Sequence, residues 1–263
     1  MRGSRILFFI GIAIVAIVGG GLLGIWATRG KTSGAFEVKP GLYGVKSGGG
    51  IYLYAARVGD AAVLFDTGGD GQGRPVDALL GPMGMSRANV NTGGLIFLTH
   101  GHFDHIQGAV PFTPAKIYLG LGDVGLAAGT TPPEAVITRL LGLVMQGTPV
   151  KVTDPLSGVQ VVAIGGGKTV KAIPMPGHTP GSYAYLYDGV LFVGDSMVFK
   201  EGRLETTPAM FDPRPEENRA AIRSLKTQLV ADTVDMVCTG HGGCTAKGLG
   251  RNLVDDLIAR VGG

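Results

Sequence analysis

Three of the five histidines in this 263-residue chain lie in one short segment, residues 99–105 (THGHFDH). His100, His102 and His105 share this segment with Asp104 and a glycine. Buried in an apolar core, so many polar atoms would cost free energy unless each had a partner. Neutral imidazole and carboxylate groups are good ligands for Zn²⁺, iron and manganese. The pattern therefore indicates a metal-binding loop, with a solvated loop as the alternative.

The other two histidines also lie in glycine-bounded turns that follow apolar runs. His178 lies in the segment PGHTPGS, and His241 lies in TGHGG directly after the run VDMVC. Asp195 follows an apolar run in the same way, in the segment LFVGDS. Loops that follow strands gather at one edge of a sheet, where rigid strands position them. We therefore expect all of these side chains to converge at one edge.

The elements that must position these side chains are predicted from apolar patterning. Alternating or continuous apolar runs predict strands, at residues 51–58, 61–65, 94–99, 115–119, 159–164, 170–174, 183–187, 190–193 and 234–238. Helical spacing of apolar residues predicts helices, at residues 75–83, 134–145, 215–230 and 249–261. This order favours an α/β (α+β) domain in which helices cover a mixed sheet on both faces.

The sequence resembles the metallo-β-lactamase superfamily. THGHFDH matches the signature T-H-x-H-x-D-H of that family, and PGHTPGS, GDS and TGHG match its later motifs in the same order. The segment IYLYAARVGDAAVLFDTG resembles the opening hairpin of the family. The resemblance covers roughly residues 37–260. It implies a four-layer αββα sandwich with a metal site at the rim between two sheets.

The resemblance also implies a set of metal ligands. His100, His102 and His178 would hold one divalent ion, and Asp104, His105 and His241 would hold a second, with Asp195 between the two ions. Zn²⁺ is the expected metal, and iron and manganese are alternatives. Asp66 resembles the family's aspartate that orients a ligand histidine; the alternative is a turn carboxylate that bonds local amides.

Such a site has a definite chemistry. Two divalent ions about 3.5–4 Å apart lower the pKa of a shared water from 15.7 to about 7 and orient it as a bridging hydroxide, while one ion polarises the substrate carbonyl or phosphoryl group. Asp104 would accept a proton as the leaving group departs, and we name Asp104 and His241 as the catalytic residues. The resemblance thus implies an enzyme, a binuclear metal-dependent hydrolase.

The sequence defines the substrate class less closely than it defines the type of reaction. Glyoxalase II-type thioesterases add a helical C-terminal domain, nuclease branches add basic domains, and one zinc β-lactamase type has a cysteine near residues 195–196. We expect neither added domain in this protein, and residues 195–196 are Asp and Ser. We expect a small ester, thioester or lactone as substrate. β-Lactam hydrolysis, a mononuclear-iron sulfur dioxygenase of the same superfamily and a non-catalytic binding protein are the alternatives.

The N-terminal segment differs from the rest of the chain. Residues 6–27 are uncharged, and Arg2, Arg5, Arg29 and Lys31 flank them. A helix of this length spans about 33 Å, close to the ~30 Å hydrocarbon core of a bilayer. We therefore expect residues 1–31 to form an uncleaved membrane anchor with its flanks, with a cleaved signal segment and a secreted protein as the alternative. The catalytic domain, residues 32–263, is expected on the extracytoplasmic side.

The charge balance bears on the partners. The formal net charge is +3, but without the four flanking basic residues 19 Lys and Arg remain against 20 Asp and Glu, a net of −1. The sequence therefore gives no basis for a nucleic-acid-binding surface. We expect a small-molecule substrate and a membrane contact through residues 6–27. The oligomeric state is left open.

Two further interpretations concern the surroundings of the site. Cys238 and Cys244 flank His241, and we expect them to be unbonded because disulfide geometry is demanding; a disulfide around the loop is the alternative. The predicted helix 134–145 is expected to cover the site. Four apolar residues after Asp195 either line a substrate pocket or belong to the core, namely Met197, Phe199, Met210 and Phe211.

Overall fold

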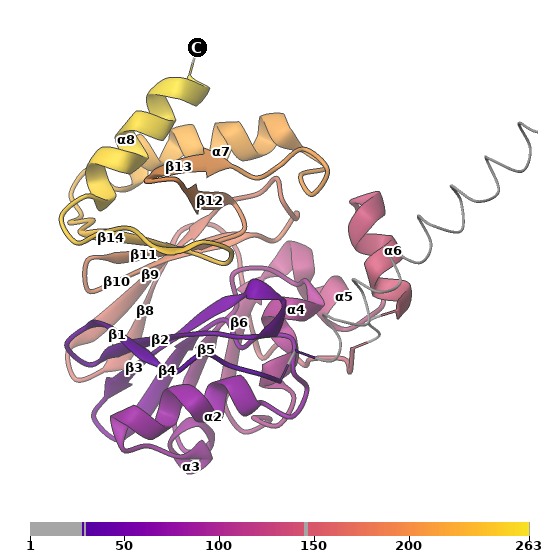
Figure 1. Cartoon of the computed structure of the whole chain (residues 1–263), viewed down its shortest axis with the longest axis vertical. Helices are drawn as coiled ribbons and strands as arrows, with labels where there is room; N and C mark the ends of the chain where they lie inside the picture. The colour runs from indigo at the N-terminus through magenta and orange to yellow at the C-terminus, as the bar shows by residue number, and fades with distance from the viewer. Residues whose placement is uncertain (1–27, 29, 145–146, 263) are drawn as a thin grey trace, which may run out of the picture.

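The computed structural model describes residues 28, 30–144 and 147–262. Two sheets pack face to face, and each has helices on its outer face, so the layers run helix, sheet, sheet, helix (Figure 1). The predicted four-layer αββα sandwich is therefore confirmed. Within the described part of the chain, no helix is long and apolar enough to cross a membrane. The predicted span at residues 6–27 lies outside the described residues.

The first sheet has its seven strands in chain order, and its later half is parallel. The strands are β1 (Phe36–Lys39), β2 (Leu42–Lys46), β3 (Tyr52–Val58), β4 (Ala61–Phe65), β5 (Leu95–Phe97), β6 (Lys116–Gly120) and β7 (Asp154–Leu156). Because β4, β5 and β6 are parallel, the loops that follow them leave the sheet at one edge. These loops begin at Asp66, Leu98 and Leu121.

The second sheet has the order β15-β14-β11-β10-β9-β8. Its strands are β8 (Gln160–Gly165), β9 (Lys168–Pro174), β10 (Tyr183–Tyr187), β11 (Val190–Gly194), β14 (Met236–Thr239) and β15 (Gly243–Cys244). β11 and β14 are parallel, and β9 is antiparallel to β10, which is antiparallel to β11. The ends of β9, β11 and β14 therefore lie at the same edge of this sheet.

The helices cover the two outer faces. Helices α2 (Arg74–Leu80) and α3 (Arg87–Asn91) pack on the first sheet, and α7 (Pro215–Gln228) and α8 (Gly250–Val261) pack on the second. Three short helices lie near the site edge: α4 (Phe103–Ile106), α5 (Val124–Ala127) and α6 (Val136–Val144). Between the sheets, the rings of Phe65 and Phe192 stack with their centroids 4.0 Å apart. The inter-sheet core is therefore closed, and the site lies at its rim.

Two hairpins with two-residue turns were absent from the sequence prediction. Strands β1 and β2 turn at Pro40 and Gly41, and Gly41 has a φ of 79°, a turn signal that the sequence does contain. The small hairpin of β12 (Met197–Lys200) and β13 (Arg203–Thr206) turns at Glu201 and Gly202, which both have positive φ. A glutamate in this conformation is uncommon, so the turn carries no strong sequence signal.

Candidate metal centre

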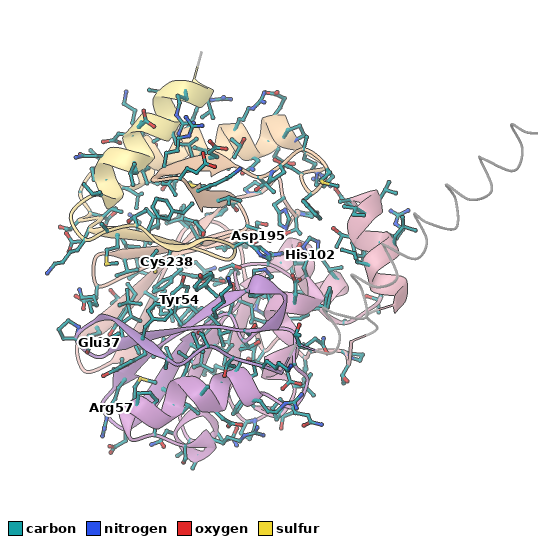
Figure 2. The ribbon with its side chains drawn as sticks, viewed as in Figure 1. Glu37, Tyr54, Arg57, His102, Asp195 and Cys238 are labelled. Carbon is teal, nitrogen blue, oxygen red and sulfur yellow. A yellow bond between two sulfur atoms is a disulfide. The ribbon has the colours of Figure 1, made fainter. Side chains whose placement is uncertain are left out.

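Loops from both sheets bring the seven candidate ligands together. The loop after β5 carries His100, His102, Asp104 and His105, and the loops after β9, β11 and β14 carry one residue each: His178, Asp195 and His241. The side chains of His102 and Asp195 lie near each other at the rim between the two sheets (Figure 2), and both line the same cavity. The predicted convergence at one edge is therefore observed.

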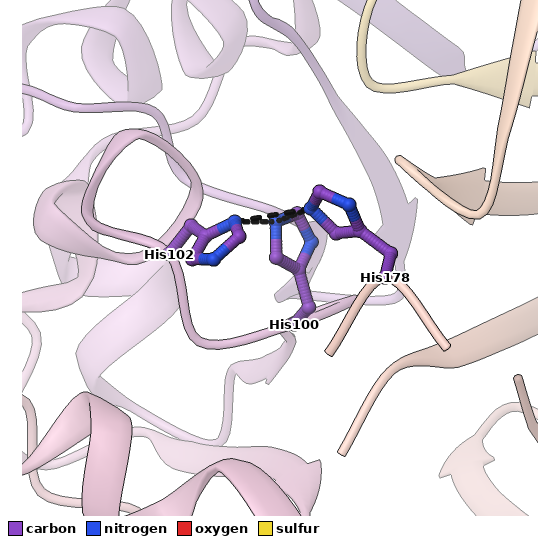
Figure 3. Close-up of side chains that lie close together, drawn as sticks. All are labelled: His100, His102 and His178. Carbon is purple, nitrogen blue, oxygen red and sulfur yellow. Dashed lines mark hydrogen bonds between the residues drawn. The ribbon is translucent and has the colours of Figure 1, made fainter. Parts of the chain in front are cut away.

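His100, His102 and His178 form a compact group of ring nitrogens (Figure 3). Nε2 of His100 lies 3.0 Å from Nδ1 of His102 and 3.2 Å from Nε2 of His178, and the last two nitrogens are 3.0 Å apart. A hydrogen bond needs one donor and one acceptor, so three mutually close nitrogens cannot satisfy all three pairs. Three lone pairs around a cation remove this conflict. Bonds of about 2.0–2.1 Å to a tetrahedral Zn²⁺ separate two nitrogens by about 3.3 Å, close to the spacing seen here.

A hydrogen-bonded chain fixes the ring orientation of His100. The hydroxyl of Thr99 donates to Oδ2 of Asp66 at 2.8 Å, and its oxygen lies 3.1 Å from Nδ1 of His100. Because the single hydroxyl proton is directed at the carboxylate, the oxygen accepts the proton of His100 Nδ1. Nε2 of His100 therefore presents a lone pair to the group. The buried backbone N–H of Thr99 also donates to Asp66, at 2.7 Å.

The ionisation of this group suits metal binding. Burial, together with the neighbouring imidazoles of His105, His178 and His102, holds the pKa of His100 well below its usual value. Burial likewise lowers the pKa of His102 and of His178, although the carboxylate of Asp195 opposes the effect on both. A ligand imidazole must be neutral, so the fold keeps these three side chains in the form that binds a cation.

Asp104, His105 and His241 form the second group, and Asp195 lies between the two groups. The carboxylate of Asp195 has one oxygen 3.8 Å from Nε2 of His178 and 3.4 Å from Nε2 of His241. Its other oxygen lies 3.4 Å from Nε2 of His105. Nε2 of His241 is 3.9 Å from the carboxylate of Asp104. Asp195 thus contacts side chains of both groups, as a bridging residue must.

Unpartnered buried atoms point into this second group. Nε2 of His105 and Oδ1 of Asp195 are both buried without a hydrogen-bond partner among the described residues. His105 Nδ1 lies 2.8 Å from the carboxylate of Asp66, so in the neutral imidazole Nε2 carries the lone pair that faces Asp195. Two acceptors face each other there, and a cation between them satisfies both. The residues present therefore fit a divalent metal ion.

The electrostatic field at this position favours positive charge. Burial disfavours the imidazolium of His105, yet the carboxylates of Asp195 and Asp66 hold its pKa well above the usual value. Asp195 also raises the pKa of His241. Burial alone would raise the pKa of Asp195, but the imidazoles of His241 and His105 hold it well below its usual range. The field that stabilises a proton here also stabilises a bound cation.

Asp66 acts as more than a turn residue. Its buried carboxylate accepts hydrogen bonds from the backbone and hydroxyl of Thr99 and from Nδ1 of His105. It therefore orients the ring of His105, which is the first of the two interpretations of this residue. It also bonds a backbone amide, but that amide belongs to the loop after β5 rather than to its own turn.

Asp123 is a functional residue that the sequence prediction missed. Its fully buried carboxylate accepts hydrogen bonds of 2.7 Å from the backbone N–H of both Gly101 and Gly181, and one of 2.6 Å from the hydroxyl of Thr179. It therefore joins the loop that carries His100 to the loop that carries His178. The sequence did contain one signal for this residue: Asp123 follows the apolar strand β6, as Asp66 follows β4.

The expectation of unbonded cysteines is wrong. Cys238 and Cys244 are cross-strand partners in β14 and β15, and a disulfide joins them. The register of this short hairpin places the two side chains opposite each other, a relationship that the spacing of six residues alone did not reveal. The disulfide closes the hairpin whose turn carries His241.

A cavity of about 370 Å³ lies beside the centre, and candidate ligands from both groups line it. Helix α6 contributes Thr138 and Leu141 to the lining, which agrees with its predicted place over the site. Of the four apolar residues after Asp195, Phe211 lines the cavity. Met197 is buried in the core beneath α7 and Phe199 packs against that core, whereas Met210 is exposed.

Comparisons with known proteins agree with this geometry. Residues 48–241 match the sequence profile of the metallo-beta-lactamase superfamily. The uncharacterized protein YobT of Bacillus subtilis (strain 168) is 30% identical over an alignment of 164 residues, and the match covers 56% of this chain. The match spans 66% of that relative, slightly less than two thirds of its length.

Solved structures share the fold at low sequence identity. BJP-1, a subclass B3 metallo-beta-lactamase of Bradyrhizobium japonicum, is 22% identical with a TM-score of 0.59, covering 81% of this chain and 80% of its own. A beta-lactamase from Chitinophaga pinensis is 19% identical with a TM-score of 0.63, covering 88% and 92%. An archaeal superfamily protein from Sulfolobus tokodaii is 20% identical with a TM-score of 0.56, covering 84% and 85%.

The family assignment rests on the sequence profile. The matched residues 48–241 make up more than half of the chain and include all seven converging side chains. The solved structures support the same fold. The chain therefore belongs to the metallo-beta-lactamase superfamily.

Proposed function

We propose that this protein is a metal-dependent hydrolase that cleaves a small ester, thioester or lactone. The observation that carries the proposal is the group of three ring nitrogens from His100, His102 and His178, which lie 3.0–3.2 Å apart and cannot satisfy one another. A cavity of about 370 Å³ borders this group, large enough for a small acyl substrate.

The side chains of the site would bind the metal ions, and one of them would also transfer a proton. His100, His102 and His178 would hold one divalent ion, and Asp104, His105 and His241 would hold a second, with Asp195 between them. When bound, divalent ions supply Lewis acidity, which polarises an acyl carbonyl and acidifies water. Asp104 is partly exposed and lines the cavity, so its carboxylate is placed to take a proton as the leaving group departs. His241 lies beside it at the cavity wall.

The proposal is tested by metal content and hydrolysis together. Protein grown on defined metals is assayed for bound zinc, iron and manganese, and against esters, thioesters, lactones, phosphodiesters and β-lactams. We expect about two divalent ions per chain and hydrolysis of an acyl substrate that a chelator abolishes. His102→Ala should remove one ion and the activity, whereas Lys200→Ala, at an exposed end of β12, should change neither. Full activity in His102→Ala would contradict the proposal.

β-Lactam hydrolysis is the second candidate function. It is favoured by the second donor group, in which His105 lies beside Asp104 and His241 and no cysteine takes part. Two of the structures that share the fold are described as beta-lactamases. The β-lactam arm of the substrate panel separates this candidate from the first. Bound iron at one ion per chain would instead favour the dioxygenase alternative.

A further inference from the structure

The wall of the cavity beyond the candidate ligands is apolar. Phe103, Leu141, Val198, Pro208 and Phe211 supply most of its side chains. Two threonines supply the neutral polar groups, and one of them, Thr207, already donates its hydroxyl to the backbone carbonyl of Asp195. A substrate group that occupies this part of the cavity therefore meets mostly hydrocarbon, and the hydroxyl of Thr138 is the side-chain donor that remains there among the described lining residues.

Basic side chains are missing from the described lining. Four basic residues lie within three positions of a lining residue: Lys46, Arg139, Lys200 and Arg214. The ammonium of Lys46 lies 5.6 Å from the ring centroid of Tyr52, and that of Lys200 is exposed and 3.8 Å from Glu201. Arg214 lies three positions after the lining residue Phe211. It makes a bidentate ion pair with Glu134, at 2.5 and 2.8 Å, and a second ion pair with Glu217 at 3.2 Å. Arg139, on α6 beside Thr138, is exposed and donates to the carbonyl of Pro133. None of these four cations lines the cavity, so none is placed there to receive an anionic substrate group.

The remaining charges of the cavity have the wrong sign for an anion. Asp104 and Asp195 are its carboxylates, and both belong to the proposed metal centre. An anionic group could therefore be neutralised only at the centre itself, where the scissile carbonyl would also bind. A second anionic group elsewhere in the substrate would be desolvated against hydrocarbon without a partner, which is costly.

Two further parts of the wall agree with an apolar occupant. Gly48 and Gly49, between β2 and β3, line the cavity and contribute only backbone. On α6, Leu141 faces the cavity, while Leu140, the residue before it, is 55% exposed on the outside of the helix. The same helix therefore offers a position inside the cavity and a matched position outside it.

We infer that the substrate of this site carries an uncharged, apolar acyl group, so that its scissile carbonyl is its only group that needs polar recognition. The inference rests on the proposed hydrolase function and adds the substrate class to it. In the reaction, the oxygen of water forms a bond to the acyl carbon and the bond to the leaving oxygen breaks. For a p-nitrophenyl hexanoate probe, the products are hexanoic acid and p-nitrophenol.

The test uses two probes that differ in one terminal group. The full chain, loaded with Zn²⁺, is assayed with p-nitrophenyl hexanoate and with the mono-p-nitrophenyl ester of adipic acid, which has the same carbon number but ends in a carboxylate. We expect kcat/KM to be at least about ten-fold higher for the hexanoate, because the carboxylate would be buried without a partner. Equal rates, or a preference for the adipate ester, would overturn the inference while leaving the proposed function standing.

Calorimetry gives a readout that does not depend on turnover. The dissociation constants of hexanohydroxamic acid and of adipic acid monohydroxamate are compared on the same protein, since both bind a metal ion through the same group. We expect at least about ten-fold tighter binding of the first. If neither ester is cleaved but this ratio holds, the substrate class stands and the proposed reaction fails. If neither hydroxamate binds and neither ester is cleaved, both are overturned.

Two matched variants on α6 test whether the cavity wall causes the preference for the hexanoate probe over the adipate probe. Leu141→Lys places an ammonium group in the cavity, so the hexanoate-to-adipate ratio should fall about ten-fold or invert. Leu140→Lys places the same charge outside and should leave the ratio within two-fold of the parent value. An equal change in both variants would mean that long-range charge, rather than the cavity wall, sets the preference, and this would contradict the inference.

Discussion

The carboxylate of Asp66 lies 2.8 Å from Nδ1 of His105, and this contact determines which ring nitrogen of His105 faces the metal centre. The same carboxylate accepts the hydroxyl proton of Thr99, which in turn sets the ring orientation of His100. One residue at the end of β4 therefore orients a side chain in each of the two groups. It does so without itself belonging to either group.

We predict that Asp66→Asn weakens metal binding about 10- to 100-fold while the protein stays folded, because loss of an orienting partner typically has an effect of this size. Asparagine is the informative substitution, since Asp66 has a φ of 58° and asparagine tolerates this conformation better than alanine. Metal affinity is measured by competition with a chelator. Asp77→Asn, which removes an exposed ion pair with Arg87, serves as the control. An unchanged affinity in Asp66→Asn would show that the contact does not orient the ring.

Asp123 makes a comparable link between the two loops that carry His100 and His178. In Asp123→Asn, the amide nitrogen must face one of the backbone N–H groups of Gly101 and Gly181, leaving a buried donor unpaired. We predict that the free energy of unfolding falls by about 1–3 kcal/mol and that affinity for the first metal ion falls with it. Chemical unfolding with and without metal separates the two effects. Asp255→Asn, on the exposed side of α8, should change neither quantity; equal behaviour of the two variants would refute the link.

Much of the architecture could be predicted because the buried strands are continuous apolar runs. The predicted hairpin 51–58 and 61–65 corresponds to β3 and β4, and the run 190–193 corresponds to β11. The convergence of the candidate ligands could also be predicted, since each follows a strand. The hairpin of β12 and β13 could not, because its turn at Glu201 depends on a conformation that few non-glycine residues adopt.

Contacts between distant loops could not be predicted from the sequence. Asp123 is recognisable only when Gly101 and Gly181 are seen to donate to it from two different loops. The disulfide depends on the register that places Cys238 opposite Cys244. Apolar periodicity reports which face of an element is buried, and it carries no information about which polar groups meet across a gap.

Asp70 gives a pH-dependent contribution to stability through its ion pair with Arg74. Its buried carboxylate accepts hydrogen bonds from Nε and Nη2 of Arg74 at 2.7 and 2.9 Å. These side-chain hydrogen bonds lower the pKa of Asp70, although burial opposes them. A carboxyl whose pKa is lower in the folded than in the unfolded state stabilises the fold above its unfolded pKa, and this contribution is lost as the pH falls through the folded value.

We therefore predict that Asp70→Asn lowers the free energy of unfolding by about 1 kcal/mol at pH 7, and that the difference from the parent protein disappears at an acid pH at which the carboxyl of Asp70 is protonated in the folded protein as well. Urea unfolding at both pH values, in the presence of a chelator so that metal binding does not contribute, measures this difference. Asp60→Asn, at a fully exposed carboxylate, provides the comparison. A difference that persists unchanged at low pH would mean that shape, rather than charge, accounts for the effect.

Gly240 lies where the second group leaves no room for a side chain. A Cβ at this position would lie 2.2 Å from Oδ1 of Asp195 and 2.7 Å from Cε1 of His105. We predict that Gly240→Ala displaces these two side chains and lowers affinity for one of two metal ions by at least about ten-fold, while the group of His100, His102 and His178 keeps its ion. Metal stoichiometry after dialysis is the measurement. Gly34→Ala adds the same methyl group in open space and should retain both ions. Equal loss of both ions in Gly240→Ala would contradict the division of the seven side chains into two groups.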